Sequence, residues 1–125
     1  MIADTTFASD LLREQSRGRR GAATIFFVEH RKDTIRMSII TAGELSVLFP
    51  NAAAAWQWLG KWTVYRLHPG IVDAAADIDR ELLREGRRLG ENDNWIAGFA
   101  RYYREPLISR DMAFGSVPGI RLALY

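Results

Sequence analysis

Short apolar runs with the spacing of β-strands alternate along the chain with stretches whose apolar residues recur every three or four positions. The strand-like runs are expected at residues 1–4, 35–40, 63–67, 107–109 and 120–125, with helical stretches between them. Parallel strands need a crossover connection, which is usually a helix. The alternation therefore predicts an α/β fold with a mostly parallel sheet of four to five short strands, covered on both faces.

Several helix boundaries follow from local signals. Thr41 and Glu44 match a capping box, so a helix is expected from Thr41 to Phe49. Further helices are expected before residue 35, over residues 52–62, and along an apolar stripe that begins at Ile71 and is closed by Gly90. Asp93 is expected to open a helix over residues 94–104. These helices would form the crossovers between the strands.

The composition narrows the class of protein. The 125 residues fit one domain, which we expect to span residues 1–125. Cysteine is absent, which excludes disulfides and thiolate metal sites. The chain shows neither a signal peptide nor an apolar run long enough for a membrane span, so a cytoplasmic protein is expected. The net charge of +2 is too small to indicate nucleic-acid binding by itself.

Four carboxylates are expected at one edge of this sheet. Asp4 ends the first strand, Glu44 lies one turn into the helix after the second, and Asp111 follows the strand at 107–109. Asp93 stands at the start of a helix that must face the same edge. Open parallel sheets place their functional sites at the carboxyl ends of the strands.

Such a convergence of acids favours a divalent cation, which would relieve their mutual repulsion. Oxygen ligands alone select hard ions, so Mg²⁺ or Mn²⁺ is predicted. An ion of this kind can hold a phosphodiester, lower the pKa of a water molecule and stabilise a leaving oxygen. The four acids are therefore candidate metal ligands and catalytic residues.

Each acid also has a purely structural interpretation. Asp4 fits a helix cap, and Glu44 fits the capping box with Thr41. Asp93 fits a first-turn acid that interacts favourably with the helix dipole, and Asp111 fits a turn. Four such coincidences on one sheet edge are less plausible than any one of them alone.

Four segments, taken in order, resemble the PIN-domain toxins of the VapC type. They are residues 4–6, 38–45, 91–97 and 108–114, and the closing Val117-Pro118-Gly119-Ile120 fits as well. The segment Glu91-Asn92-Asp93-Asn94-Trp95-Ile96-Ala97 is the most specific of them. One position departs from the pattern, because Thr6 stands where many relatives have Asn. We interpret Thr6 and Asn92 as residues that support the acids or contact the substrate.

The resemblance implies an α/β/α sandwich and a Mg²⁺- or Mn²⁺-dependent endoribonuclease, the toxic component of a toxin–antitoxin pair. Asp4, Glu44, Asp93 and Asp111 would then be the catalytic and metal-binding residues. It further implies an RNA substrate, with transfer RNA as one candidate, a cognate antitoxin protein and a homodimer. No membrane partner is expected.

Two groups of side chains suggest binding surfaces. Arg87 and Arg88 lead through Gly90 towards Asp93, so they are candidates for holding RNA phosphates at the mouth of the acidic site. The cluster at Arg17, Arg19 and Arg20 fits either an RNA contact or a solvated loop. The tryptophans at positions 56, 58 and 62 favour core packing and a partner interface, with base stacking as a lesser alternative.

Two other functions fit parts of this pattern. A receiver-like phosphoacceptor domain has a similar acidic pocket, but it needs a lysine near its last strands, and no lysine follows Lys61. A catalytically inactive PIN module that binds RNA or protein is the second alternative. The presence of all four acids gives no support to loss of activity.

Overall fold

A computed structural model describes all 125 residues and contains one sheet of five very short strands. The strands are β1 (Ile2–Ala3), β2 (Arg36–Ser38), β3 (Thr63–Tyr65), β4 (Leu107–Ile108) and β5 (Leu122–Ala123). Their order in the sheet is β3-β2-β1-β4-β5, and every neighbouring pair is parallel. The predicted parallel sheet of four to five strands is therefore confirmed.

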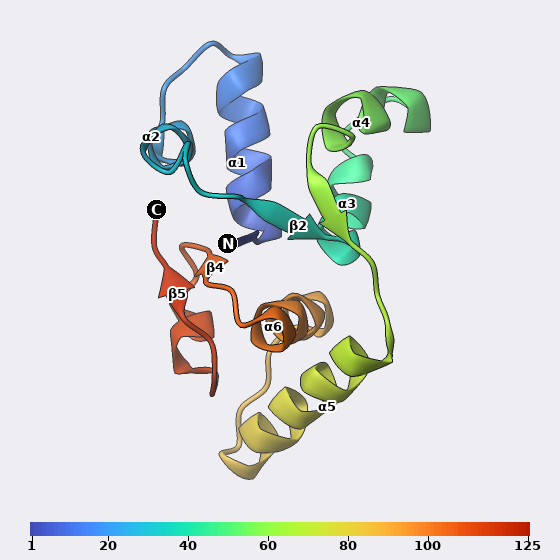
Figure 1. Cartoon of the computed structure of the whole chain (residues 1–125), viewed down its shortest axis with the longest axis vertical. Helices are drawn as coiled ribbons and strands as arrows, with labels where there is room; N and C mark the ends of the chain where they lie inside the picture. Colours follow the sequence, from blue (N-terminus) through green and yellow to red (C-terminus); the bar gives the residue numbers. More distant parts are fainter.

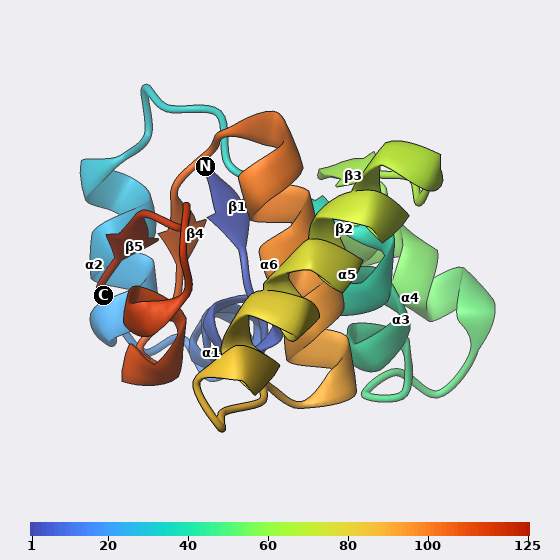
Figure 2. The same ribbon diagram turned by 90° about the horizontal axis from the view of Figure 1, so that it is seen from below.

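Six α-helices form two layers that enclose this sheet. They are α1 (Thr5–Ser16), α2 (Ala22–Glu29), α3 (Ile39–Ser46), α4 (Ala52–Leu59), α5 (Pro69–Arg84) and α6 (Glu91–Tyr103). Helices α1 to α4 lie on one side of the sheet and α5 and α6 on the other (Figure 1), while the view from below shows α5 and α6 crossing the sheet side by side (Figure 2). The α/β/α sandwich is thus confirmed. No helix is long and apolar enough to cross a membrane.

Consecutive residues of the two central strands serve opposite cores, as the alternation of side chains in a strand requires. Ile2 of β1 belongs to the core beneath α5 and α6, whereas Ala3 belongs to the core beneath α1 and α2. Leu107 and Ile108 of β4 divide in the same way. Two-residue strands can therefore anchor both helical layers and fix where their carboxyl ends lie.

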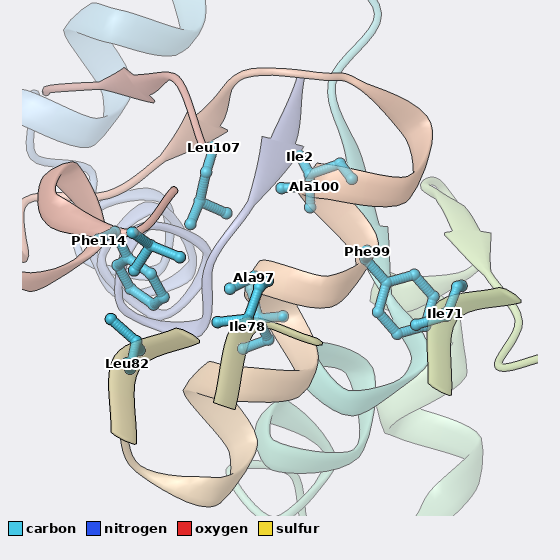
Figure 3. Packing of buried hydrophobic residues seen from close by; sticks show 11 residues of the cluster. Ile2, Ile71, Ile78, Leu82, Ala97, Phe99, Ala100, Leu107 and Phe114 are labelled. Carbon is cyan, nitrogen blue, oxygen red and sulfur yellow. The ribbon is translucent and has the colours of Figure 1, made fainter. Parts of the chain in front are cut away.

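The α5–α6 layer is held by apolar packing and by one close backbone approach. Ile71 of α5 lies beside Phe99 of α6, and Ile78 lies beside Ala97, whereas Leu82 points towards Phe114 (Figure 3). All of these side chains are almost completely buried. A Cβ atom on Gly98 would lie only 2.8 Å from the Cβ atom of Ala75. The glycine therefore lets the two helices meet closely at the middle of α6.

The region around residue 40 differs from the sequence prediction. Strand β2 ends at Ser38, and the hydroxyl of Ser38 accepts a hydrogen bond from the amide of Thr41 at 3.0 Å. Ser38 is thus the N-cap of α3, and the predicted capping box at Thr41 and Glu44 was wrong. Apolar Ile39 continues the strand pattern, which concealed a helix start set by the serine.

Other helix boundaries also differ from the sequence prediction. Helix α4 ends at Leu59 rather than at residue 62, and α5 ends at Arg84, shortly before Gly86 with its positive φ of 68°. Helix α6 begins at Glu91, so Asp93 lies within its first turn instead of before it. A short 3₁₀ helix, η1 (Met112–Ser116), was not predicted.

Candidate active site

Four elements bring the predicted acids to the carboxyl edge of the sheet. Asp4 directly follows β1, Asp111 follows β4, Glu44 lies in α3 after β2, and Asp93 lies in the first turn of α6. Their charges influence one another: Asp93 and Asp111 both raise the pKa of Asp4, and Glu44 raises that of Asp93. Acids separated by up to 107 positions in sequence therefore share one electrostatic environment.

Asp4 is the most deeply buried of these carboxylates, with 3% of its surface exposed. It caps α1, because its Oδ1 accepts a hydrogen bond from the amide of Phe7 at 2.6 Å. Burial is the largest influence on its ionisation, and repulsion from Asp93 and Asp111 adds to it. These effects outweigh the hydrogen bonds from Ser109 and Phe7 and raise the pKa of Asp4 to about 6. Asp4 therefore caps α1 and also lies within the electrostatic environment of the acidic edge.

Asp93 makes no capping hydrogen bond, since the N-cap of α6 is Gly90 and no side chain caps that helix. Burial raises the pKa of Asp93, and the charges of Glu44 and Asp111 raise it further. Its position in the first turn does place it near the positive end of the helix dipole. Even so, a carboxylate of raised pKa, partly buried and without a cationic partner, is typical of a functional site.

Two polar side chains fix the orientation of Glu44. The amide of Asn92 donates to its Oε1 at 2.7 Å, and the hydroxyl of Thr5 donates to its Oε2. Asn92 thus supports an acid, which is one of the two roles that we considered for it. Thr5, which sequence reasoning passed over, contacts Glu44, whereas the side chain of Thr6 makes no hydrogen bond. The helix places the two threonines about 100° apart, so only one can face α3.

Asp111 is exposed and caps η1, its Oδ1 accepting from the amide of Ala113 at 2.8 Å. The backbone amide of Asp111 itself donates to the hydroxyl of Ser109 at 3.0 Å. Ser109 is completely buried, and its hydroxyl lowers the pKa of Asp4, so this residue after β4 also influences the carboxylate that follows β1. We did not single out Ser109 from the sequence, although a serine directly after a buried strand is a signal of this kind.

A fifth carboxylate, that of Asp10, lies at the centre of a neighbouring cluster of polar side chains. Its Oδ2 accepts from the hydroxyl of Tyr125 at 2.9 Å and pairs with Arg110 at 2.9 Å, while Oδ1 pairs with Arg13 at 3.1 Å. Arg110 lies between Ser109 and Asp111 in the chain. Asp10 therefore ties the segment that carries these two residues to α1, a link between residues 100 positions apart that no local pattern reveals.

The residues present fit a hydrated divalent ion better than a fully dehydrated one. No three acidic or histidine side chains converge closely enough to coordinate an ion together. Mg²⁺ keeps several waters and commonly takes only one or two carboxylates directly. A cation bound here would relieve the mutual repulsion of Asp4, Asp93 and Asp111.

The arginines proposed for RNA binding already have partners. Arg87 pairs with Glu85 and also donates to the carbonyl of Ser116 at 3.2 Å, which joins the α5–α6 connection to η1. Arg88 pairs with Asp79 at 3.2 Å. Both are at least partly exposed, and Arg87 contacts the segment that begins beside Asp111.

The fold matches several solved structures of distant relatives. VapBC2 from Rickettsia felis, bound to a promoter DNA fragment, has a TM-score of 0.83 at 16% identity, covering 99% of this chain and 97% of that one. DNA-bound VapBC from Salmonella typhimurium has a TM-score of 0.80 at 20% identity, with 98% and 96% covered. FitAcB from Neisseria gonorrhoeae has a TM-score of 0.76 at 16% identity, with 97% and 94% covered. At these low identities, the TM-scores show a shared fold and no more.

Comparison with curated protein sequences found no match. The family model for the PIN domain, in contrast, matches residues 1–120, which include all four acids and the strands that position them. The family match, the order of the strands in the sheet and the acidic edge agree, so the chain belongs to the PIN domain family.

Proposed function

We propose that this protein is a Mg²⁺- or Mn²⁺-dependent endoribonuclease that acts as the toxin of a toxin–antitoxin pair. The observation that carries the proposal is the acidic edge itself, where burial and the charges of neighbouring acids raise the pKa of Asp4 and that of Asp93, and no cationic side chain offsets them. A protein that only used these acids for folding would gain from pairing them, as it does elsewhere with Glu81 and Arg101.

The chain's own residues would orient the reaction. Asp4 and Asp93 are the preferred metal ligands, and Ser109 and the amide of Phe7 hold Asp4 in place. Asn92 and Thr5 hold Glu44, which completes the acidic edge together with Asp111. When bound, the ion would neutralise phosphate charge and activate a water molecule for attack on the phosphodiester.

The toxin role is supported by the kinds of complex in which similar structures were solved. The similar structures include VapBC and FitAB assemblies and a toxin–antitoxin complex from Klebsiella pneumoniae, which has 21% identity and a TM-score of 0.73. We propose a cognate antitoxin as partner and the cytoplasm as the site of action. A homodimer is proposed through exposed apolar residues of the α3–α4 region, Val47, Leu48 and Trp56.

The decisive experiment expresses the protein in bacteria without an antitoxin and measures growth and the integrity of cellular RNA. Wild type should stop growth, whereas Asp4→Asn, Glu44→Gln, Asp93→Asn or Asp111→Asn should be tolerated. The matched control is Asp77→Asn, because Asp77 is an exposed acid of α5 paired only with Arg80. Normal growth with folded wild-type protein would contradict the toxin role.

Cleavage of RNA by the purified protein separates the enzyme from an inactive PIN module. We expect cleavage with Mg²⁺ or Mn²⁺, none with EDTA, and none for Asp4→Asn or Asp93→Asn in either condition. RNA binding by wild type without cleavage under any metal condition would favour the inactive binding module instead.

A further inference from the structure

A cleft of about 600 Å³ opens on the opposite edge of the sheet, away from the acids. Its lining comes from the segments that precede β2 and β3, so it lies at the amino ends of these strands. The volume falls within the range of about 300–1,000 Å³ that is usual for small-molecule sites. We name it the aromatic cleft and define it by Phe27, Trp58 and Trp62 together with Arg31, Lys32 and Lys61.

The three cations of the aromatic cleft have no acidic partner. Lys32 and Lys61 are the only lysines of the chain, and both lie here beside Arg31. All three are exposed, and none of them takes part in an ion pair. Asp33 is the single carboxylate of the lining. The cleft therefore carries a net positive charge from side chains that are available to bind an anion.

The aromatic residues form a fixed wall beside these cations. The rings of Trp58 and Trp62 lie 5.3 Å apart at 46°, and those of Phe27 and Trp62 lie 5.8 Å apart at 57°. The indole Nε1 of Trp58 donates to Oε1 of Gln15 at 3.3 Å, which links α4 to α1. Trp58 and Trp62 also pack on the core that contains Leu45 and Leu59. Each indole is therefore half-buried, with its position set before any ligand binds.

We infer that the aromatic cleft binds a nucleotide, with the base against Trp58 or Trp62 and the phosphate at Arg31, Lys32 and Lys61. Stacking on fixed aromatic rings recognises any base, and cationic side chains recognise the phosphate. The pairing of the two features distinguishes a nucleotide from a simple anion, which needs no aromatic wall, and from an apolar ligand, which needs no cations. The nucleotide can be free or belong to an RNA strand. Binding of an RNA strand in the cleft rests on the proposed function, whereas binding of a free nucleotide does not.

The first test titrates the metal-free protein with adenosine 5′-monophosphate and follows tryptophan fluorescence and the heat of binding. We expect quenching and saturable binding that Lys61→Gln and Arg31→Gln each weaken about tenfold, since each removes a charged contact to phosphate. Arg84→Gln, an exposed arginine of α5 outside the cleft, should leave the affinity unchanged. Inorganic phosphate should bind at least about tenfold more weakly than the nucleotide, because it cannot stack.

The second test adds an RNA octamer in an Asp4→Asn background, which is expected not to cleave it. Binding of the octamer that is tighter than binding of the mononucleotide and is weakened about tenfold by Lys61→Gln identifies a strand as the ligand. Equal affinity for the octamer and the mononucleotide identifies a free nucleotide. No binding of the mononucleotide at millimolar concentration, or equal affinity for inorganic phosphate, would overturn the inference. Binding of an acidic peptide without binding of the nucleotide would overturn it too and would assign the cleft to a protein partner. Failure here leaves the metal and growth tests of the acidic edge unaffected.

Discussion

Two carboxylates at opposite ends of the same sheet have opposite surroundings. Asp4 follows β1 at the carboxyl edge, and burial together with two neighbouring acids raises its pKa to about 6. Glu105 precedes β4 at the amino edge and accepts from the hydroxyl of Tyr65 at 2.5 Å and from Arg36 at 3.1 Å. It also pairs with the amino group of Met1 at 2.8 Å. Burial opposes ionisation of Glu105 as well, but these partners outweigh it and lower its pKa.

This contrast shows that the fold is able to satisfy a half-buried acid. Arg36 and Tyr65 come from β2 and β3, so other strands of the same sheet supply partners for Glu105. Asp4 directly follows the central strand β1 and receives only neutral donors. The unbalanced charge of the carboxyl edge is therefore a local property of that edge. Sites that bind a cation as part of their function show this imbalance.

The largest expected effect on stability comes from Asp4→Asn in the metal-free protein at pH 8. Because Asn caps a helix as well as Asp does and carries no charge, it should stabilise the fold by up to about 3 kcal/mol. Urea unfolding in EDTA measures this change. Equal or lower stability of the variant would show that the charge of Asp4 does not destabilise the metal-free protein.

The same carboxylate sets a pH dependence with a definite sign. A pKa raised from 3.8 to about 6 means that the folded protein binds a proton more tightly than the unfolded chain. The metal-free wild type should therefore gain stability as the pH falls from 8 to 5, and Asp4→Asn should gain less. Glu105 works in the opposite direction: its contribution is present above its ordinary pKa of 4.5 and disappears as the pH falls through its lowered value. Thermal unfolding between pH 3 and pH 8 tests both signs.

Glu105→Gln should destabilise the protein by about 2 kcal/mol at pH 7, because it leaves Arg36 without its anion in a half-buried position. The control is Asp77→Asn, which removes an exposed acid and should change stability by less than about 0.5 kcal/mol. If Glu105→Gln left the stability unchanged, the ion pairs of Glu105 would not stabilise the fold, and Glu105 would not differ from Asp4 in this respect.

Asn92→Ala should leave Glu44 less firmly oriented at the acidic edge, because it removes the amide that donates to Oε1 of Glu44. We expect about tenfold weaker binding of Mn²⁺, since supporting hydrogen bonds typically contribute that much to metal affinity. Calorimetric titration with Mn²⁺ measures this, and Asn51→Ala in the cap of α4 is the matched control. Unchanged affinity would limit Asn92 to folding or substrate contact.

The smallest expected effect concerns the arginines near η1. If Arg87 and Arg88 offset the acidic edge for an incoming RNA, replacing both with Gln should weaken RNA binding. It should also flatten the salt dependence by about 0.7 in log–log slope for each phosphate that the variant no longer neutralises. RNA affinity across a salt series in Ca²⁺ measures this. Unchanged slope and affinity would leave the two residues as partners of Glu85 and Asp79 alone.

The sequence predicted the architecture because each strand and helix carries its own periodicity. The same periodicity could not separate Ile39 and Ile40 from the preceding strand, since apolar residues fit either element; the cap at Ser38 decided the boundary. The four acids were placed on one edge because a parallel sheet sends all its carboxyl ends there. The sequence could not predict that Lys32 lies close to Lys61 and the tryptophans, because this depends on how the segments before β2 and β3 pack together.

Supporting contacts within the site were also only partly predictable. Asn92 was identified through its motif, but the choice of Thr5 over Thr6 depends on the rotation of α1 relative to α3. Ser109 and Asp10 act through hydrogen bonds that span the sheet or join the chain's two ends. Such partners emerge from tertiary packing, and no local pattern encodes them.

The edge strands of this sheet have a consequence for how other chains can attach to it. β3 has three residues and β5 has two, so each edge offers very few unpaired backbone amides and carbonyls. Strand addition, in which a foreign segment extends the sheet or copies of the protein join edge to edge, requires a longer template. Partners must therefore be recognised through side chains on the helical layers, and the folded protein is protected against aggregation through its own sheet.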